Sequence, residues 1–147
     1  MKKKRKVRNK SDVSLLKEKA WKEVSLYVRL SHANKDGFVK CFTCDNIKFW
    51  KEMQAGHFVP GRGNSILFDI RGIRPQCYGC NIMHAGRQLE FLGRLEQDMG
   101  KTEAIELKDE LMKSANEPYK FKREELESII EKFRTRNKVL LDFHDRN

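Results

Sequence analysis

The stretch that decides the fold is Cys41–Asn81, "CFTCDNIKFWKEMQAGHFVPGRGNSILFDIRGIRPQCYGCN". It holds all four cysteines of the chain as two Cys-x-x-Cys pairs, and a single histidine, His57, lies between the pairs. Each such pair places two thiolates on one knuckle, and two knuckles suit a tetrahedral zinc ion. The sequence therefore predicts one structural Zn²⁺ per chain, held by Cys41, Cys44, Cys77 and Cys80.

A zinc ion with four thiolate ligands has no open coordination position, so this ion is not expected to be catalytic. A redox role for one Cys-x-x-Cys pair is the alternative. Disulfides are not expected, because no hydrophobic signal region follows the N-terminus. Any chemistry must then come from residues between the knuckles.

The composition predicts one small domain that needs help beyond apolar burial. The 147 residues are 39% hydrophobic and 35% charged, which is a weak basis for a self-sufficient core. A metal clamp would supply the missing stability. No stretch approaches the length of a membrane span, so we expect a soluble, cytoplasmic protein without a membrane partner.

Most of the net charge of +10 lies at the N-terminus. Met1–Lys10 contains seven Lys or Arg and no acid, and the rest of the chain has 24 basic against 21 acidic residues. We expect residues 1–11 to be a disordered basic arm that favours nucleic acid by counterion release, or else a merely solvated tail. The string KKKRKV also resembles a nuclear localisation signal, which would act only in a eukaryotic context.

The predicted fold class is α+β, with a zinc-bound core between N- and C-terminal helices. The predicted regions are an N-terminal helix at 12–34, the core at 35–95 and a C-terminal helical region at 96–147. The apolar residues of the first helix recur at helical spacing, and Ser11 or Asp12 is expected to cap its start.

Within the core, Phe38–Trp50 predicts a hairpin with the first cysteine pair at its bend. Gln54–Val59 and Ile66–Arg74 predict two strands joined by the turn-rich "PGRGNS". Beyond the core, the apolar stripe Leu89–Met99 predicts a helix that Gly100 ends. Two more helices are expected, one capped by Thr102 and one beginning near Arg123.

All basic residues between Gln54 and Arg94 are arginines. A guanidinium can bind two phosphate oxygens at once, which a lysine cannot do. These side chains are therefore the predicted DNA contacts, although an ordinary exposed surface would look the same. They are Arg62, Arg71, Arg74, Arg87 and Arg94.

His57 draws attention as the one histidine between the knuckles, and a neutral imidazole near pH 7 can take a proton from water. A packed or hydrogen-bonded structural histidine is the alternative. The strings "WKEMQAGHF", "LFDIRGIRPQC" and "CYGCN" resemble the lambdoid phage NinG/Rap recombination proteins, within the HNH or ββα-metal nuclease superfamily. The resemblance runs from Lys19 to near Phe133.

The resemblance implies a zinc-clamped ββα-metal core and a metal-dependent endonuclease in the cytoplasm of a bacterial host. Its expected substrates are branched recombination intermediates such as Holliday junctions and D-loops. His57 matches the base of the superfamily, and Asn81 matches the ligand of a catalytic Mg²⁺ or Mn²⁺. A helix cap is the alternative role for Asn81.

Two positions depart from the pattern that the resemblance implies. Many HNH enzymes have an aspartate ligand just before the base, where this chain has Gly56. Asp69 is the candidate replacement, with Glu90 behind it, although Asp69 could instead pair with Arg71 or Arg74. Relatives usually carry an asparagine where this chain has Gly72, and that change could weaken activity.

Two function classes other than a nuclease are also compatible with the sequence. A non-catalytic zinc module that binds nucleic acid is the main alternative, and a protein-interaction zinc domain fits the arginine-only centre less well. Junction resolution cuts two strands symmetrically, so a homodimer is expected. Its interface would be the apolar stripe of Val13–Tyr27 or that of Leu126–Leu141.

Overall fold

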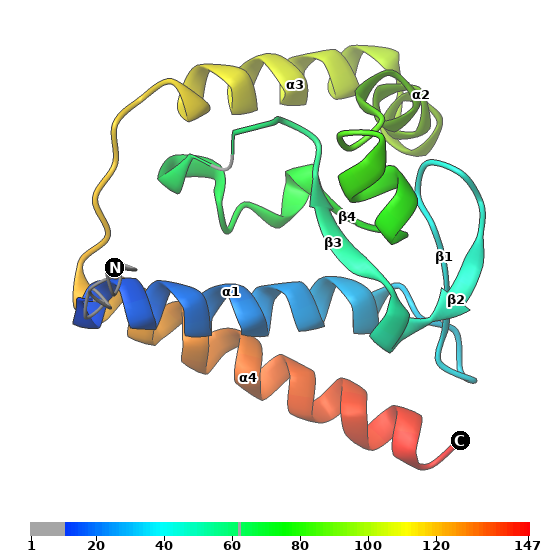
Figure 1. The fold of residues 1–147 in the computed structure, drawn as a ribbon, viewed down its shortest axis with the longest axis horizontal. Coiled ribbons are helices and arrows are strands. Elements are labelled where there is room, and N and C mark those ends of the chain that lie inside the picture. Colours follow the sequence, from blue (N-terminus) through cyan, green and yellow to red (C-terminus); the bar gives the residue numbers. More distant parts are fainter. Residues whose placement is uncertain (1–10, 62) are drawn as a thin grey trace, which may run out of the picture.

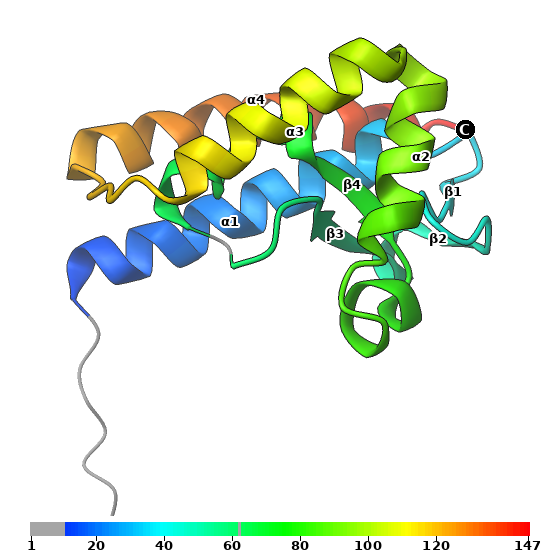
Figure 2. The same ribbon diagram turned by 90° about the horizontal axis from the view of Figure 1, so that it is seen from above.

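The computed structural model describes residues 11–61 and 63–147. Two hairpins lie between a pair of long helices on one side and a pair of shorter helices on the other (Figures 1 and 2). The helices are α1 (Asp12–Ser31), α2 (Gln88–Met99), α3 (Lys101–Ala115) and α4 (Arg123–Asp145). The strands are β1 (Phe38–Lys40), β2 (Ile47–Phe49), β3 (Gln54–His57) and β4 (Ile73–Gln76). Single helical turns are η1 (Trp50–Glu52), η2 (Asn64–Ile66), η3 (Ile70–Gly72) and η4 (Gly79–Met83).

Helix α1 begins as predicted, because the Ser11 side chain accepts a hydrogen bond from the N–H of Ser14. Helix α4 lies along α1 in the same direction (Figure 1). Arg123 at the start of α4 pairs with Asp12 at 3.1 Å, and the buried Asn137 donates to Glu23 further along. The two helices therefore pack together over much of their length.

This helix pair corrects the expected dimer interface. Val24 and Val28 of α1 cluster with Phe133 of α4, and Ala20 clusters with Leu126. The two predicted stripes thus bury most of their apolar residues against each other within one chain. They bury each other because an apolar helix face is most stable when another covers it.

The first hairpin agrees with the prediction. Strands β1 and β2 are antiparallel, with Val39 opposite Lys48, and the first cysteine pair lies in the bend between them. The side chain of Asn34 accepts hydrogen bonds from the N–H groups of Asp36 and Phe38, which holds the turn before β1.

The second hairpin is formed by β3 and β4, with Gly56 opposite Arg74 and His57 opposite Ile73. The predicted strand at 66–74 is wrong for most of its length, because extended pairing starts only at Ile73. Residues 64–72 form the turns η2 and η3 instead. The Asp69 side chain accepts from the N–H of Arg71 and so stabilises η3 in place of a strand.

The second cysteine pair is followed by η4 and then by α2 and α3. Helix α3 is preceded by Gly100, whose φ of +101° suits glycine, so the predicted cap at Thr102 is wrong by two residues. Phe58 from the second hairpin stacks on Phe91 of α2, with ring centroids 5.1 Å apart. This contact seats the hairpin against the α2–α3 pair.

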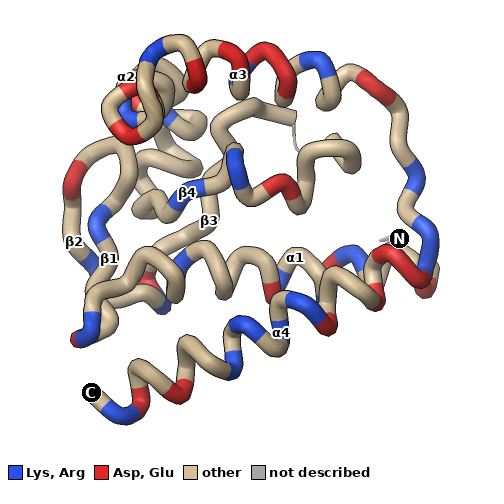
Figure 3. The backbone as a smooth tube through the Cα atoms, turned by 180° about the vertical axis from the view of Figure 1, so that it is seen from behind, with Lys and Arg blue, Asp and Glu red and all other residues tan. Residues whose placement is uncertain are grey.

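Charge is unevenly distributed over the helices (Figure 3). Helix α3 carries a run of acidic side chains at Glu103, Glu106, Asp109 and Glu110. The same helix also carries Lys101, Lys108 and Lys113, so charges of both signs lie along it. None of the helices in the described part of the chain is both long and apolar enough to cross a membrane.

Candidate metal centre and adjoining cleft

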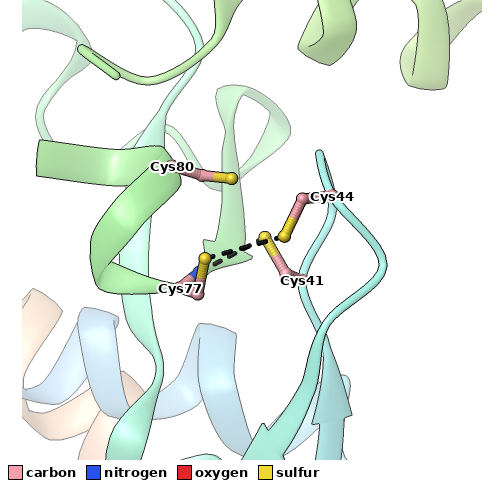
Figure 4. Close-up of side chains that lie close together, drawn as sticks. All are labelled: Cys41, Cys44, Cys77 and Cys80. Atoms are coloured by element: carbon pink, nitrogen blue, oxygen red, sulfur yellow. Dashed lines mark hydrogen bonds between the residues drawn. The ribbon is translucent and has the colours of Figure 1, made fainter. Parts of the chain in front are cut away.

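The four cysteines converge on one point between the first hairpin and η4. Their sulfur atoms all lie within 4.8 Å of one another, and three of the four residues are buried (Figure 4). The Sγ atoms of Cys44 and Cys77 are 3.7 Å apart. The set is positioned to bind a metal ion and is compatible with the predicted structural zinc.

The surroundings of the thiols prepare one of them for ionisation. Burial opposes ionisation of Cys41, but hydrogen bonds from the backbone N–H groups of Cys77 and Thr43 prevail and lower its pKa to about 6. Burial and neighbouring thiols raise the pKa of Cys44 to about 12. Burial also raises the pKa of Cys80. A metal cation would favour the thiolate form of all four.

His57 ends strand β3 and is half-buried. Its Nε2 lies 3.0 Å from the carbonyl oxygen of Leu67, and its ring stacks on Trp21 of α1 with centroids 4.9 Å apart. A carbonyl oxygen can only accept, so Nε2 carries the hydrogen of this bond. In the neutral ring the lone pair is then on Nδ1.

Asn81 follows the last cysteine directly and lies inside η4. Its Nδ2 donates to Oε1 of Gln54 on β3 at 2.7 Å, so its amide is tied to the strand that carries His57. The N-cap of η4 is Tyr78, so Asn81 does not cap this turn.

His57 and Asn81 line the same cleft, whose volume is about 420 Å³. Trp21 of α1 and Gln54 of β3 line it too, as do residues of η4 and the segment after it. The cleft is thus bounded by the second hairpin, by α1 and by η4. None of the described residues that line it is an aspartate or a glutamate.

Asp69 does not line this cleft, and the alternative pairing is the one observed. Arg71 donates to Oδ2 of Asp69 at 2.7 Å and to Oε1 of Glu110 at 2.9 Å. Burial opposes ionisation of Asp69, but these hydrogen bonds from Arg71 hold its pKa below the usual range. Glu90 forms an ion pair with Arg87 at 3.5 Å. A carboxylate ligand for an ion in the cleft is therefore not found at either predicted position.

Four of the five predicted arginines have partners within the chain, and Arg62 lies outside the described residues. Besides Arg71 and Arg87, Arg94 pairs with Asp45. Arg74 donates to backbone carbonyl oxygens, including that of Ile73 at 2.9 Å. None of these four lines the cleft with His57, so the expected arginine-lined surface around that residue is not observed. Their contact with DNA stays a prediction.

Gln76 is a residue of this region that the sequence did not single out. It is the last residue of β4 and is fully buried, and it donates to the hydroxyl of Thr43 and the carbonyl of Gly86. Its position directly before Cys77 is no signal by itself, because Lys40 and Asp45 also adjoin cysteines of the cluster and are exposed.

Gly72 supports the segment after His57 through its backbone. Its carbonyl oxygen accepts from the N–H of Phe58 at 2.8 Å. A Cβ added at Gly72 would lie 2.6 Å from Cδ1 of Leu111, so any side chain here points at α3. The packing of α3 thus accounts for glycine at this position.

We therefore expect Gly72→Asn to destabilise the protein by about 1–3 kcal/mol, the usual cost of overpacking a core. Urea unfolding of this variant, followed by circular dichroism, measures the change. Gly93→Asn is the matched control, because nothing lies within 4 Å of the Cβ position of Gly93. A Gly72→Asn protein as stable as the wild type would contradict the packing argument.

Fold and site together define a small α+β protein whose two hairpins meet at a cluster of four cysteines positioned to bind a metal ion. Residues 1–142 match the family model described as Bacteriophage Lambda NinG protein, and the chain belongs to this family. The resemblance to NinG proteins is thereby confirmed. No curated protein and no solved structure matches the chain.

Proposed function

We propose that this phage-family protein is a metal-dependent DNA endonuclease of the HNH type. Its substrates would be branched recombination intermediates such as Holliday junctions and D-loops. The observation that carries the proposal is the shared cleft of His57 and Asn81, formed by an antiparallel hairpin and the helical turn after it. A strand–strand–helix unit with a histidine and an amide on one cleft supports the superfamily resemblance.

His57 is proposed to activate the attacking water. The hydrogen bond from Nε2 to the Leu67 carbonyl fixes the ring orientation and leaves the lone pair of the neutral ring on Nδ1, which would accept the proton. Stacking on Trp21 restricts rotation of the ring further. A base held in this way needs little reorganisation when the substrate phosphate arrives.

Asn81 is proposed to bind the catalytic ion through its amide oxygen. The donor set fits a hard cation, because the cleft presents the side-chain amides of Gln54, Asn81 and Gln88, and amide oxygens are suitable ligands for such an ion. When bound, Mg²⁺ or Mn²⁺ would stabilise the charge on the phosphate and on the leaving oxygen. The structural zinc would hold Asn81 in place, because Cys80 precedes it in the chain.

The substrate and setting follow from family and charge. A basic segment at residues 1–10 would add sequence-independent affinity for DNA. Membership of a phage family supports a place of action in the cytoplasm of the bacterial host. Symmetric cutting of a four-way junction would require two copies, so we propose a homodimer whose interface lies outside the buried α1–α4 contact.

A labelled four-way DNA junction, incubated beside a linear duplex of the same sequence, tests the proposal. We expect nicking of the junction with Mg²⁺ or Mn²⁺ and none when EDTA replaces the ion. Equal cutting of the two substrates would contradict selectivity for branched DNA. Tight binding without cutting under any divalent metal would contradict the nuclease itself.

One observation favours a second candidate, a zinc module that binds nucleic acid without cutting it. No carboxylate lines the cleft among the described residues, and hard cations usually bind through at least one carboxylate. The junction assay separates the two functions, because binding and cutting are followed on the same samples.

A further inference from the structure

Two amide oxygens converge on Gly56, the residue before His57. A Cβ built on Gly56 would lie 1.9 Å from Oε1 of Gln76 and 3.0 Å from Oδ1 of Asn81. The first distance is far below any contact that a real Cβ makes, so no side chain fits at position 56. The oxygen of Gln76 thus takes the place that a side chain of residue 56 would fill.

The orientation of the Gln76 amide is chemically determined. Its nitrogen lies 2.9 Å from the carbonyl oxygen of Gly86, which accepts only, so the other end of the amide must be the oxygen. Gln76 is fully buried, and its Oε1 has no hydrogen-bond partner among the described residues. A buried acceptor without a donor has lost its hydrogen bonds to water and gained none in return, which is unfavourable.

The amide oxygen of Asn81 makes the position of the Gln76 oxygen still less favourable. The Nδ2 of Asn81 is used by Gln54, which leaves the oxygen of the Asn81 amide on the side of Gly56. Two partial negative charges then face one region with no donor between them. A cation bound by both oxygens would turn this repulsion into attraction, and carbonyl oxygens are suitable ligands for a hard divalent ion.

We infer that Gln76 supplies the second protein ligand of the divalent ion, sharing it with Asn81. The inference rests on the proposed function. In many HNH enzymes an aspartate just before the base binds the ion, and here the amide oxygen of Gln76 would take the place of that carboxylate oxygen. This oxygen comes from β4, the strand opposite Gly56, because the absence of a side chain at Gly56 leaves room for that of Gln76. Asn81 lines the cleft, so the ion enters from that side.

A site made of two neutral amides has a consequence for affinity. Neither ligand offsets the charge of the ion, and the lining of the cleft adds no carboxylate among the described residues. The negative charge must then come from the DNA phosphate. Ion binding is therefore expected to be weak in the free protein and strong in the DNA complex.

Mn²⁺ binding tests the inference without any cleavage step. Electron paramagnetic resonance reports bound Mn²⁺ in the His57→Ala protein, in which slow cleavage is expected, with and without a four-way junction. We expect the junction to promote binding, and Gln76→Met to weaken it about tenfold or more. Gln97→Met, at an exposed position of α2, is the matched control and should leave binding unchanged.

The zinc content and the thermal melting curve show whether Gln76→Met is folded. If it is not, anomalous diffraction from Mn²⁺ in crystals of the His57→Ala complex locates the ion directly. An ion bound by Asn81 and not by Gln76 overturns the inference, even where the wild type cuts DNA. An ion between the two oxygens supports it, even where the wild type does not cut. Failure of the site and failure of the nuclease are thus distinguishable.

One specific result would also overturn the inference. Rotation of the Asn81 amide would bring its Nδ2 to the oxygen of Gln76, and the buried acceptor would then be satisfied without an ion. A structure of the DNA complex with Mn²⁺ that contains this Asn81–Gln76 hydrogen bond excludes shared ion binding.

Discussion

Replacing His57 by alanine is expected to lower the rate of junction cleavage by about 10²–10⁴-fold, the usual contribution of a general base. The imidazole is oriented from two sides, by the Leu67 carbonyl and by the ring of Trp21. Alanine removes the proton acceptor and leaves the amide side of the cleft, Gln54 and Asn81, in place. DNA binding and Mn²⁺ binding should therefore persist.

Single-turnover cleavage of a labelled junction measures this rate, and binding is followed on the same samples. His144→Ala is the matched control, because His144 lies in the last turn of α4 and does not line the cleft. Thermal melting of each variant shows whether the loss of stacking on Trp21 disturbs the fold. Cleavage at the wild-type rate by His57→Ala would exclude this residue as the base.

Removal of the structural zinc is expected to unfold the region around the cysteine cluster. Zinc binding by four thiolates contributes about 10–16 kcal/mol in small modules. A domain of this size is stable by only about 5–15 kcal/mol, so few other contacts can compensate. The first hairpin is the element most sensitive to zinc removal, because its strands have only three residues each.

Metal analysis should give one zinc per chain, and a strong chelator should abolish the cooperative melting transition of the wild type. Re-addition separates the two metals: Mg²⁺ alone should not restore cleavage, whereas Zn²⁺ followed by Mg²⁺ should. Cys80→Ser tests the same point without a chelator. An unchanged melting curve in the metal-free protein would show that the cysteines are not a structural site.

The cysteine cluster and the long helices could be predicted from sequence because both depend on local patterns. Two Cys-x-x-Cys knuckles bring their own geometry, and Ser11 caps α1 by a contact three residues away. The bend between β1 and β2 follows from the same local signals. For these elements the deciding contacts lie within a few residues along the chain.

The remaining features depend on partners far apart in sequence. The stretch 66–74 is apolar enough for a strand, but the capping of η3 by Asp69 and the ion pair from Arg71 to Glu110 favour turns. The pairing of Glu110 with Arg71 spans 39 residues, and no local pattern indicates it. Gln76 resembles an ordinary strand residue until its contacts with Thr43, in the bend of the first hairpin, and with Gly86, after η4, are known.

The packing of α1 against α4 has a consequence for the order of events during synthesis. The contacts from Asp12 to Arg123 and from Glu23 to Asn137 span 111 and 114 residues, so the face of α1 that packs on α4 stays uncovered until α4 has been made. Trp21 of α1 also holds the His57 ring. Long-range contacts of this kind form late. A nascent chain that still lacks α4 therefore exposes the apolar residues of α1 that Leu126 and Phe133 cover in the folded protein.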